Sequence, residues 1–208
     1  MASAQRKLAI ALSRLPPHPC KDASLEQYAT EGDFAARWLT AIVEVGDLEN
    51  GIQVVDLAAG NGILGIGAVL LGAGSATLVE LDSNALDAAR NGVSSLGLSD
   101  SVECVQADVT DWLQWPEERE CGLVVMNPPW GYQSKGADRP FIEAALASPA
   151  NAIHLLHAGD ATHPPAMARE AGWSAEVLLE GEFRIPATYA HHLSRERSTS
   201  VKCWRFTR

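Results

Sequence analysis

The sequence has few cysteines, and no two of them lie close together. Its 208 residues contain Cys20, Cys104, Cys121 and Cys203, with no Cys-x-x-Cys pair. Structural zinc sites usually take ligands from such pairs, and small secreted domains use closely spaced cysteines for disulfides. The spacing therefore argues against a zinc site and indicates reduced thiols. We predict a cytoplasmic protein without a bound metal.

Long apolar runs are also missing. No stretch approaches the roughly 20 apolar residues of a membrane-spanning helix, and the first residues lack the apolar core of a signal peptide. Hydrophobic residues make up 47% of the chain and charged residues 20%, as in soluble globular proteins. We expect no membrane association and a single domain over residues 1–208. Residues 1–24 would form an N-terminal helix and a proline-rich linker, and residues 25–208 the core.

Positive charge is scarce and is concentrated at the two ends of the chain. The net charge is −10, yet the first 21 residues hold four basic and no acidic residues, and from Phe183 onward six basic residues accompany Glu196 alone. If the two ends lie close together, they would form a modest basic rim for nucleic acid around an acidic body. Ordinary solvated charge explains the same pattern.

Apolar periodicity predicts strands that alternate with helices. The predicted strands are residues 52–57, 76–81, 102–107, 123–126, 152–156, 174–179 and 200–206. The predicted helices are residues 5–15, 34–45, 62–71, 83–96, 140–147 and 165–171, with Ser83 as the N-cap of the fourth. This order predicts an α/β fold with a seven-stranded, mostly parallel sheet, a terminal antiparallel hairpin and helices on both faces.

The tetrapeptide Asn127-Pro128-Pro129-Trp130 directly follows the apolar run 123–126. It therefore leaves the carboxyl end of a predicted strand, where open α/β sheets bind ligands. An amino group conjugated to a ring is a poor nucleophile, and the Asn127 side-chain oxygen and the Pro128 carbonyl could orient its two N–H groups. Trp130 offers a face for stacking. The motif resembles that of methyltransferases that use S-adenosylmethionine to methylate adenine N6 or a glutamine amide.

Three successive predicted strands end in Asp56, Glu80 and Asp108. The loop after Asp56 contains Gly60 and Gly62, but it has neither the Gly-Lys-Ser/Thr of a phosphate loop nor three spaced dinucleotide-binding glycines. Asp56 suits an ammonium group, Glu80 can accept hydrogen bonds from two ribose hydroxyls, and Asp108 can bind an adenine amino group. The pattern resembles S-adenosylmethionine binding in Rossmann-like class I methyltransferases, and we expect that fold.

Five segments match one known family: Leu25–Thr30, Asp56–Gly62, Leu71–Gly74, Asn127–Gly131 and Ile185–Tyr189. From about Leu25 onward, the chain resembles the methyltransferase-like protein 5 family of eukaryotic ribosomal RNA adenine-N6 methyltransferases and its archaeal relatives. The resemblance implies S-adenosylmethionine as cofactor, RNA as substrate and a heterodimer with a small zinc-binding activator protein. An exposed hydrophobic strip would contact that activator.

The chain departs from the family pattern at three positions and has two tryptophans that bear on the activator. Ala58 replaces a usual Gly, Glu80 a common Asp, and Trp130 the usual Phe. The first two changes should preserve cofactor binding, whereas Trp130 enlarges the stacking face. An exposed Trp112 or Trp115 would be compatible with the strip.

The motifs and the resemblance together assign residues to three roles. The catalytic residues would be Asn127, Pro128, Pro129 and Trp130. The cofactor would contact Gln27, Tyr28, Thr30, Asp56, Ala58, Gly60, Asn61, Ile63, Glu80, Leu81, Asp108, Val109 and Asn127. The RNA would contact Tyr132, Tyr189, His191, His192 and Arg195.

The resulting hypothesis is methylation of adenine N6 in RNA, above all in small-subunit ribosomal RNA, with S-adenosylhomocysteine as the second product. One alternative is a glutamine N5-methyltransferase acting on a release factor, although only about 24 residues precede Leu25, too few for the helical domain of that family. A DNA adenine methyltransferase is disfavoured because no target-recognition segment is visible. A cofactor-binding scaffold without catalysis would not need Asn127.

Overall fold

Seven strands form one mixed sheet, which confirms the predicted fold class. The computed structural model describes residues 2–19, 30–115, 120–132, 134–185 and 197–208. The strands are β1 Gln53–Leu57, β2 Ser75–Glu80, β3 Val102–Gln106, β4 Leu123–Met126, β5 Ala152–Ala158, β6 Ser174–Ile185 and β7 Arg197–Thr207. They lie in the order β3-β2-β1-β4-β5-β7-β6. Strands β1 to β5 are parallel, whereas β7 is antiparallel to both β5 and β6.

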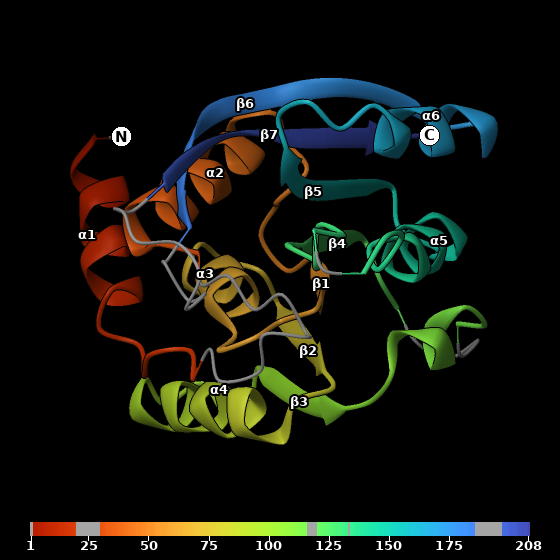
Figure 1. The fold of residues 1–208 in the computed structure, drawn as a ribbon. Coiled ribbons are helices and arrows are strands. Elements are labelled where there is room, and N and C mark those ends of the chain that lie inside the picture. The colour runs from red at the N-terminus through yellow and green to blue at the C-terminus, as the bar shows by residue number, and fades with distance from the viewer. Residues whose placement is uncertain (1, 20–29, 116–119, 133, 186–196) are drawn as a thin grey trace.

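Helices cover both faces of the sheet (Figure 1). They are α1 Ala2–Leu12, α2 Gly32–Glu44, α3 Ile63–Leu70, α4 Ser83–Ser95, α5 Arg139–Ala147 and α6 His163–Glu170, with the short 3-10 helix η2 Val109–Trp112. Buried residues of α1 to α4 form one apolar cluster with the sheet, and those of η2, α5 and α6 form the other. Within the described ranges, no helix has the length and apolar character needed to cross a bilayer.

Strand β4 contributes alternate side chains to the two clusters. Leu123 and Val125 pack under α1 to α4, whereas Val124 and Met126 pack under η2, α5 and α6. All four side chains are buried, as expected for a parallel strand covered on both faces, and this explains its uninterrupted apolar sequence. Asn127 is therefore the first polar residue after a strand that is fixed on both sides.

Two predicted boundaries differ in the structure. The β6–β7 ladder continues out to the pair Ile185 and Arg197, beyond the apolar alternation, because backbone pairing does not require apolar side chains. The N-cap of α4 is Asp82 and not Ser83, because the Asp82 carboxylate accepts the backbone N–H of Asn84 at 2.9 Å. Ionised Asp also interacts favourably with the positive end of the helix dipole.

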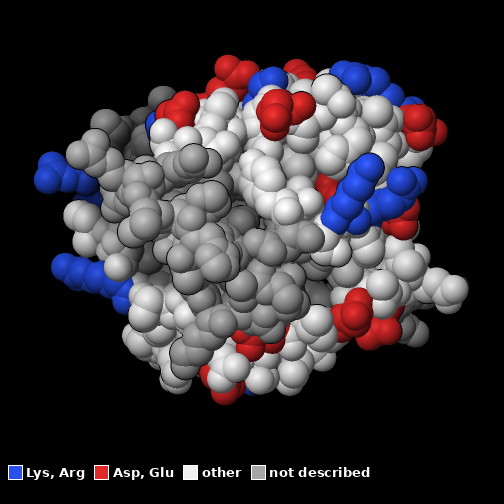
Figure 2. All heavy atoms as spheres, in the orientation of Figure 1, with Lys and Arg blue, Asp and Glu red and all other residues white. Residues whose placement is uncertain are grey.

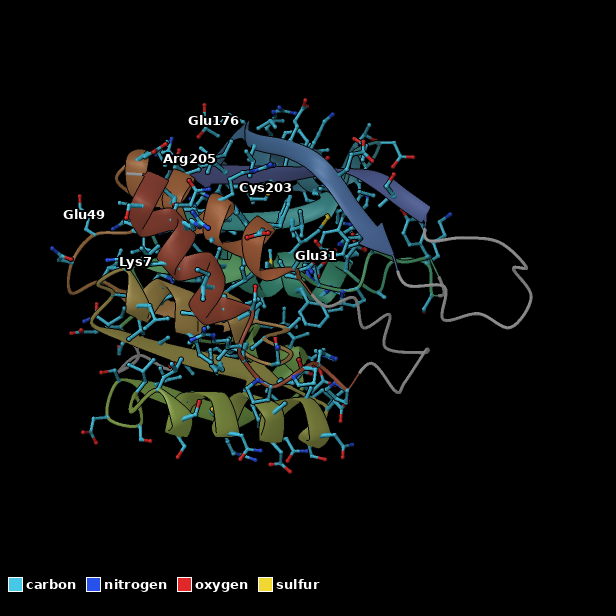
Figure 3. The ribbon with its side chains drawn as sticks, turned by 90° about the vertical axis from the view of Figure 1, so that its left-hand side faces the viewer. Lys7, Glu31, Glu49, Glu176, Cys203 and Arg205 are labelled. Atoms are coloured by element: carbon cyan, nitrogen blue, oxygen red, sulfur yellow. The ribbon has the colours of Figure 1, made fainter. Side chains whose placement is uncertain are left out.

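A partly buried ionic network ties the loop after α2 to the sheet. The Arg205 guanidinium donates to both carboxylate oxygens of Asp47, at 2.6 and 2.8 Å, and to Glu176 at 2.7 Å. His154 Nε2 lies 2.7 Å from Asp47 Oδ2. Figure 3 shows Arg205 and Glu176 at one end of the strands. Burial alone would raise the pKa of Asp47, but hydrogen bonds from Arg205 and His154 outweigh it and lower the pKa to about 2.

Three basic residues near the carboxyl terminus contact acidic or aromatic side chains. Arg205 belongs to the network above, Arg208 lies 4.7 Å from the ring centroid of Trp173, and Lys202 lies 5.9 Å from that of Trp204. On the face in Figure 2, basic side chains lie near the outer edges, and acidic side chains lie beside those at the upper and right edges. The basic rim stays a prediction, because Lys21 and Arg195 lie outside the described ranges.

We predict that Asp47→Asn lowers the free energy of unfolding at pH 7 by about 2 kcal/mol, the equivalent of the pKa difference between 3.8 and about 2. Since the folded-state pKa is depressed, this stability is present above pH 4 and is lost as the pH falls toward 2. The difference from the unchanged protein should therefore shrink between pH 5 and pH 3 in urea titrations.

The matched control is Asp87→Asn, because Asp87 forms an exposed pair with Arg90 at 2.8 Å. This change should alter stability by about 0.5 kcal/mol or less. A difference for Asp47→Asn that stays constant from pH 7 to pH 3 would contradict the assignment.

Candidate functional site

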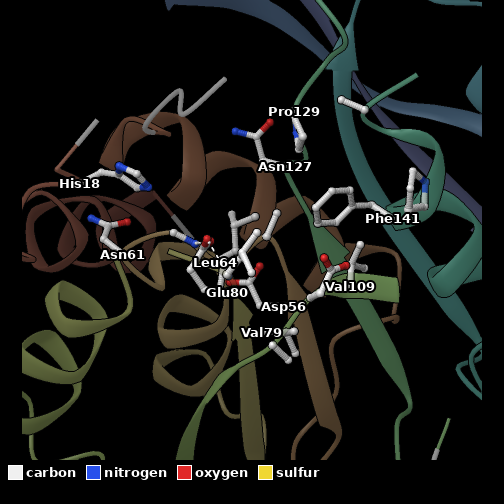
Figure 4. Close-up of a pocket in the computed structure, with 18 of the residues that line it drawn as sticks. His18, Asp56, Asn61, Leu64, Val79, Glu80, Val109, Asn127, Pro129 and Phe141 are labelled. Carbon is white, nitrogen blue, oxygen red and sulfur yellow. Dashed lines mark hydrogen bonds between the residues drawn. The ribbon is translucent and has the colours of Figure 1, made fainter. Parts of the chain in front are cut away.

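A cavity of about 380 Å³ opens at the carboxyl ends of the parallel strands. It lies where the strand order reverses between β1 and β4, the usual ligand position in open α/β sheets. Asp56 and Glu80 lie at its centre, and Asn127 and Pro129 form another wall (Figure 4). The predicted cofactor residues that line it are Thr30, Asp56, Ala58, Gly60, Asn61, Ile63, Glu80, Leu81, Asp108, Val109 and Asn127.

The turn from β1 to α3 brings its backbone to the cavity. Ala58, Gly60 and Gly62 have φ values of 59°, 56° and 79°. Such values suit glycine, and they cost an L-residue such as Ala58 roughly 1–2 kcal/mol. A Cβ atom on Gly60 would lie 2.7 Å from the His18 ring, so a larger residue there would displace the segment that covers the turn. The turn is therefore closely fitted to its surroundings.

Asp56 is a buried acid with one unsatisfied oxygen. Its side chain is 1% exposed, and Oδ2 accepts the backbone N–H of Gly65 at 2.8 Å, within the first turn of α3. Oδ1 is buried and has no hydrogen-bond partner among the described residues. Burial raises the pKa of Asp56 to about 8, although the Gly65 hydrogen bond opposes this. A cation placed at Oδ1 would stabilise the ionised form.

Glu80 and Asp108 both hold backbone groups at the cavity wall. Glu80 accepts the N–H of Gly60 at 2.8 Å through Oε2, and those of Leu81 and Asp82 at 2.9 Å through Oε1. Burial raises the pKa of Glu80 in spite of these bonds. Asp108 caps η2, and hydrogen bonds from the Thr110 N–H and hydroxyl lower its pKa. Their ribose and adenine contacts remain predictions.

Asn127 connects the cavity to the core beneath it. Its Nδ2 donates to Thr30 Oγ1 at 3.1 Å, and its Oδ1 accepts from Trp130 Nε1 at 3.1 Å. The Trp130 side chain is 5% exposed and lies between Phe183, with ring centroids 5.5 Å apart, and His157, stacked at 6.1 Å. Trp130 thus fixes the amide orientation. These two neighbours cover the indole in this structure. The role of Trp130 as a stacking face for the substrate ring stays a prediction.

Three predicted residues near the motif lie outside the cavity lining. Pro128 and Trp130 do not contribute to the lining, and Tyr132 is 55% exposed with its ring centroid 6.1 Å from that of Trp130. The other predicted residues lie outside the described ranges: Gln27, Tyr28, Tyr189, His191, His192 and Arg195.

Sequence reasoning missed His18 and Phe141, which line opposite sides of the cavity (Figure 4). His18 belongs to the proline-rich linker, which Asn61 anchors by donating to the Pro16 carbonyl at 2.9 Å. Burial lowers the pKa of His18. Phe141 lies in the first turn of α5. The prolines around His18 indicate an extended segment, but only the tertiary contact shows what that segment covers.

Comparisons with known proteins agree with this geometry. The family model described as "Methyltransferase small domain" matches residues 29–159. The rRNA N(6)-adenosine-methyltransferase Mettl5 of Drosophila melanogaster is 34% identical over 184 residues, 88% of this chain and 86% of that protein. An uncharacterized protein of Methanocaldococcus jannaschii is 32% identical over 198 residues, 90% of this chain and 87% of that protein.

A solved structure from Pyrococcus horikoshii, named as a candidate RNA methyltransferase, has 30% identity and a TM-score of 0.84. The match covers 99% of this chain and 98% of that one. These findings confirm the family resemblance drawn from the five sequence segments. The chain belongs to the small-domain methyltransferases, in the family of the Mettl5 enzymes and their archaeal relatives.

Proposed function

We propose that the protein methylates adenine N6 in ribosomal RNA of the small subunit, in the cytoplasm, with S-adenosylmethionine as the methyl donor. The observation that carries the proposal is the placement of Asn127 in one cavity with the three acidic strand ends Asp56, Glu80 and Asp108. The names of the Mettl5 relatives support adenine N6 of ribosomal RNA as the methyl acceptor. The fold and the family model support methyl transfer.

The described residues fit the cofactor. Its sulfonium group would supply the transferable methyl. The unpaired Oδ1 of Asp56 offers a counter-charge to the methionine ammonium, and Glu80 and Asp108 offer acceptors for ribose and adenine. Gly60 would let the backbone approach closely. A cavity of about 380 Å³ is within the ordinary range for small-molecule sites.

The residues that bind the methyl acceptor would act by orienting its amino group. The Asn127 carbonyl oxygen, which accepts a hydrogen bond from Trp130, would also accept one from the adenine amino group. The Pro128 carbonyl would accept the other N–H of that group. The nitrogen becomes acidic only after the methyl group is transferred, so positioning supplies most of the rate enhancement and no strong general base is required. The target adenine must leave its stack to reach this site.

RNA would approach over the exposed Tyr132, whose ring neighbours Trp130. We assign RNA contacts also to Tyr189, His191, His192 and Arg195, from the segment between β6 and β7. Gln27 and Tyr28 would close over the cofactor on the side of Thr30. These assignments are carried over from the sequence predictions.

A small zinc-binding activator protein would complete the enzyme as a heterodimer. Strand β3 is at one edge of the sheet and, within the described residues, pairs with β2 alone. Leu113, directly after the 3-10 helix that follows β3, is 40% exposed, and Leu81, directly after β2, is 50% exposed. Of the two tryptophans considered above, Trp112 is buried, at 6% exposed, and Trp115 is partly buried, with its Nε1 donating to the Ala144 carbonyl at 2.8 Å.

Replacing Asn127 tests the function most simply. We expect Asn127→Ala to lower the formation of N6-methyladenosine in small-subunit ribosomal RNA by at least about 100-fold, because one transition-state hydrogen bond is lost. Cofactor affinity should change by less than about threefold. The control Asn151→Ala alters an exposed residue directly before β5, at the amino ends of the parallel strands and so opposite the cavity, and should leave both quantities unchanged. Loss of cofactor affinity and transfer together would contradict the role assigned to Asn127.

Cofactor binding should depend on pH through Asp56. Its pKa of about 8 means that binding the ammonium group to the ionised carboxylate releases a proton below pH 8. We expect the affinity measured by calorimetry to rise by up to about tenfold per pH unit between pH 6 and pH 7.5. Asp56→Asn should bind more weakly and lose this slope. Asp108→Asn should keep the slope, since hydrogen bonds lower the pKa of Asp108. Equal slopes in all three proteins would refute the assignment.

The activator proposal also has a matched test. Leu113→Asp should abolish co-purification with a co-expressed zinc-binding activator, because it places a charge in the contact strip. Val177→Asp alters a residue of similar exposure, 38%, on β6 at the other edge of the sheet, and should retain the complex. A soluble monomer that is fully active without the activator would overturn the proposal.

A further inference from the structure

Outside the cavity lining, three potential metal ligands converge from separate elements. Asp138 precedes α5, His157 lies near the end of β5, and His163 is the first residue of α6. One ligand atom from each lies within 4.8 Å of the other two. Their spacing in the sequence matches no metal motif, so only the fold brings them together.

The three side chains share one carboxylate oxygen. His157 Nε2 lies 3.0 Å from Asp138 Oδ2, and His163 Nε2 contacts the same oxygen. Asp138 and His157 are each 2% exposed, whereas the His163 side chain is 49% exposed. The cluster is therefore buried on its inner side and accessible to solvent through His163.

The carboxyl group of Asp138 is buried, and its side-chain partners among the described residues are the two imidazoles of His157 and His163. Asp47 is a useful contrast, because its carboxylate contacts His154 and is neutralised by the Arg205 guanidinium. Buried carboxylates are normally paired with a cation or bound to a metal.

We propose that Asp138, His157 and His163 bind one divalent transition metal ion of the zinc class. Two imidazole nitrogens and a carboxylate oxygen are a common protein ligand set for such ions, with a water molecule completing the coordination. The water would occupy the exposed side near His163. This inference does not depend on the methyltransferase activity proposed above.

The ion would link the first turns of α5 and α6 to β5. It would also hold the imidazole of His157, which stacks on Trp130 at 6.1 Å with an interplanar angle of 29°. Since Trp130 orients Asn127 through a 3.1 Å hydrogen bond, metal binding would stabilise the turn that carries the Asn-Pro-Pro-Trp motif. The site is structural by this account, and its first readout is binding.

The test uses the full-length protein without a histidine tag. Zinc binding is measured by competition with a chromophoric chelator, and cobalt binding by visible absorption. We expect one ion per chain and a rise in melting temperature with zinc. His163→Ala should weaken binding at least tenfold and remove the cobalt absorption, without unfolding, because this side chain is half exposed. Asp138→Asn should have the same effect. Asp160→Asn removes a nearby exposed charge and should leave binding intact.

Two results would overturn the proposal. One is a wild-type protein that retains no zinc in the competition, which would leave a hydrogen-bonded His–Asp–His cluster. The other is equal binding by the wild type and His163→Ala, which would place the ion elsewhere on the chain. Circular dichroism of each variant confirms that lost binding does not reflect lost structure.

Discussion

The site depends on how the Asp56 carboxyl group is buried. One oxygen holds the Gly65 N–H and so fixes the start of α3, while the other has no partner among the described residues. An unsatisfied buried acceptor costs about 1–3 kcal/mol, which the surrounding core must offset. The same arrangement keeps the turn containing Gly60 in place, and Gly60 in turn holds Glu80. Folding thus creates a polar centre that a cationic ligand would complete.

The second constraint is the amide of Asn127. It bridges Thr30, which precedes α2, and Trp130, which packs in the core, at 3.1 Å in each direction. Residues 97 positions apart in the sequence therefore share one wall of the cavity. In the proposed function, the methyl donor would lie against the ends of strands β1 to β3, and the methyl acceptor against the turn after β4. A small number of backbone positions at the carboxyl ends of the parallel strands would thus determine the relative placement of the two substrates.

Much of the fold follows from local patterns. The uninterrupted apolar run of β4 indicates a parallel strand that is covered on both faces. The acidic residues at the ends of β1 and β2 indicate a ligand site at the carboxyl ends of the strands. The structure places Asp56, Glu80 and Asn127 together there. The family comparisons confirm the class of enzyme that the motifs indicate.

The remaining features depend on tertiary contacts that no local pattern encodes. His18 covers the glycine turn from a linker whose prolines specify only extended backbone. The burial of Trp130 follows from Phe183 and His157, which come from β6 and β5. Asp138 and His163 meet His157 only because α5 and α6 begin beside the end of β5. In each case, residues distant in the sequence become neighbours through the strand order.

The central claim is that this cavity presents a planar amino group of RNA to a methyl donor. The most direct test is transfer of labelled methyl from S-adenosylmethionine to three acceptors in parallel: small-subunit ribosomal RNA, intact small ribosomal subunits and a translation release factor. Each reaction is run with and without the activator. We predict label in the RNA, recovered as N6-methyladenosine after digestion to nucleosides. Label in the release factor alone, or in no acceptor despite tight cofactor binding and added activator, would contradict the account.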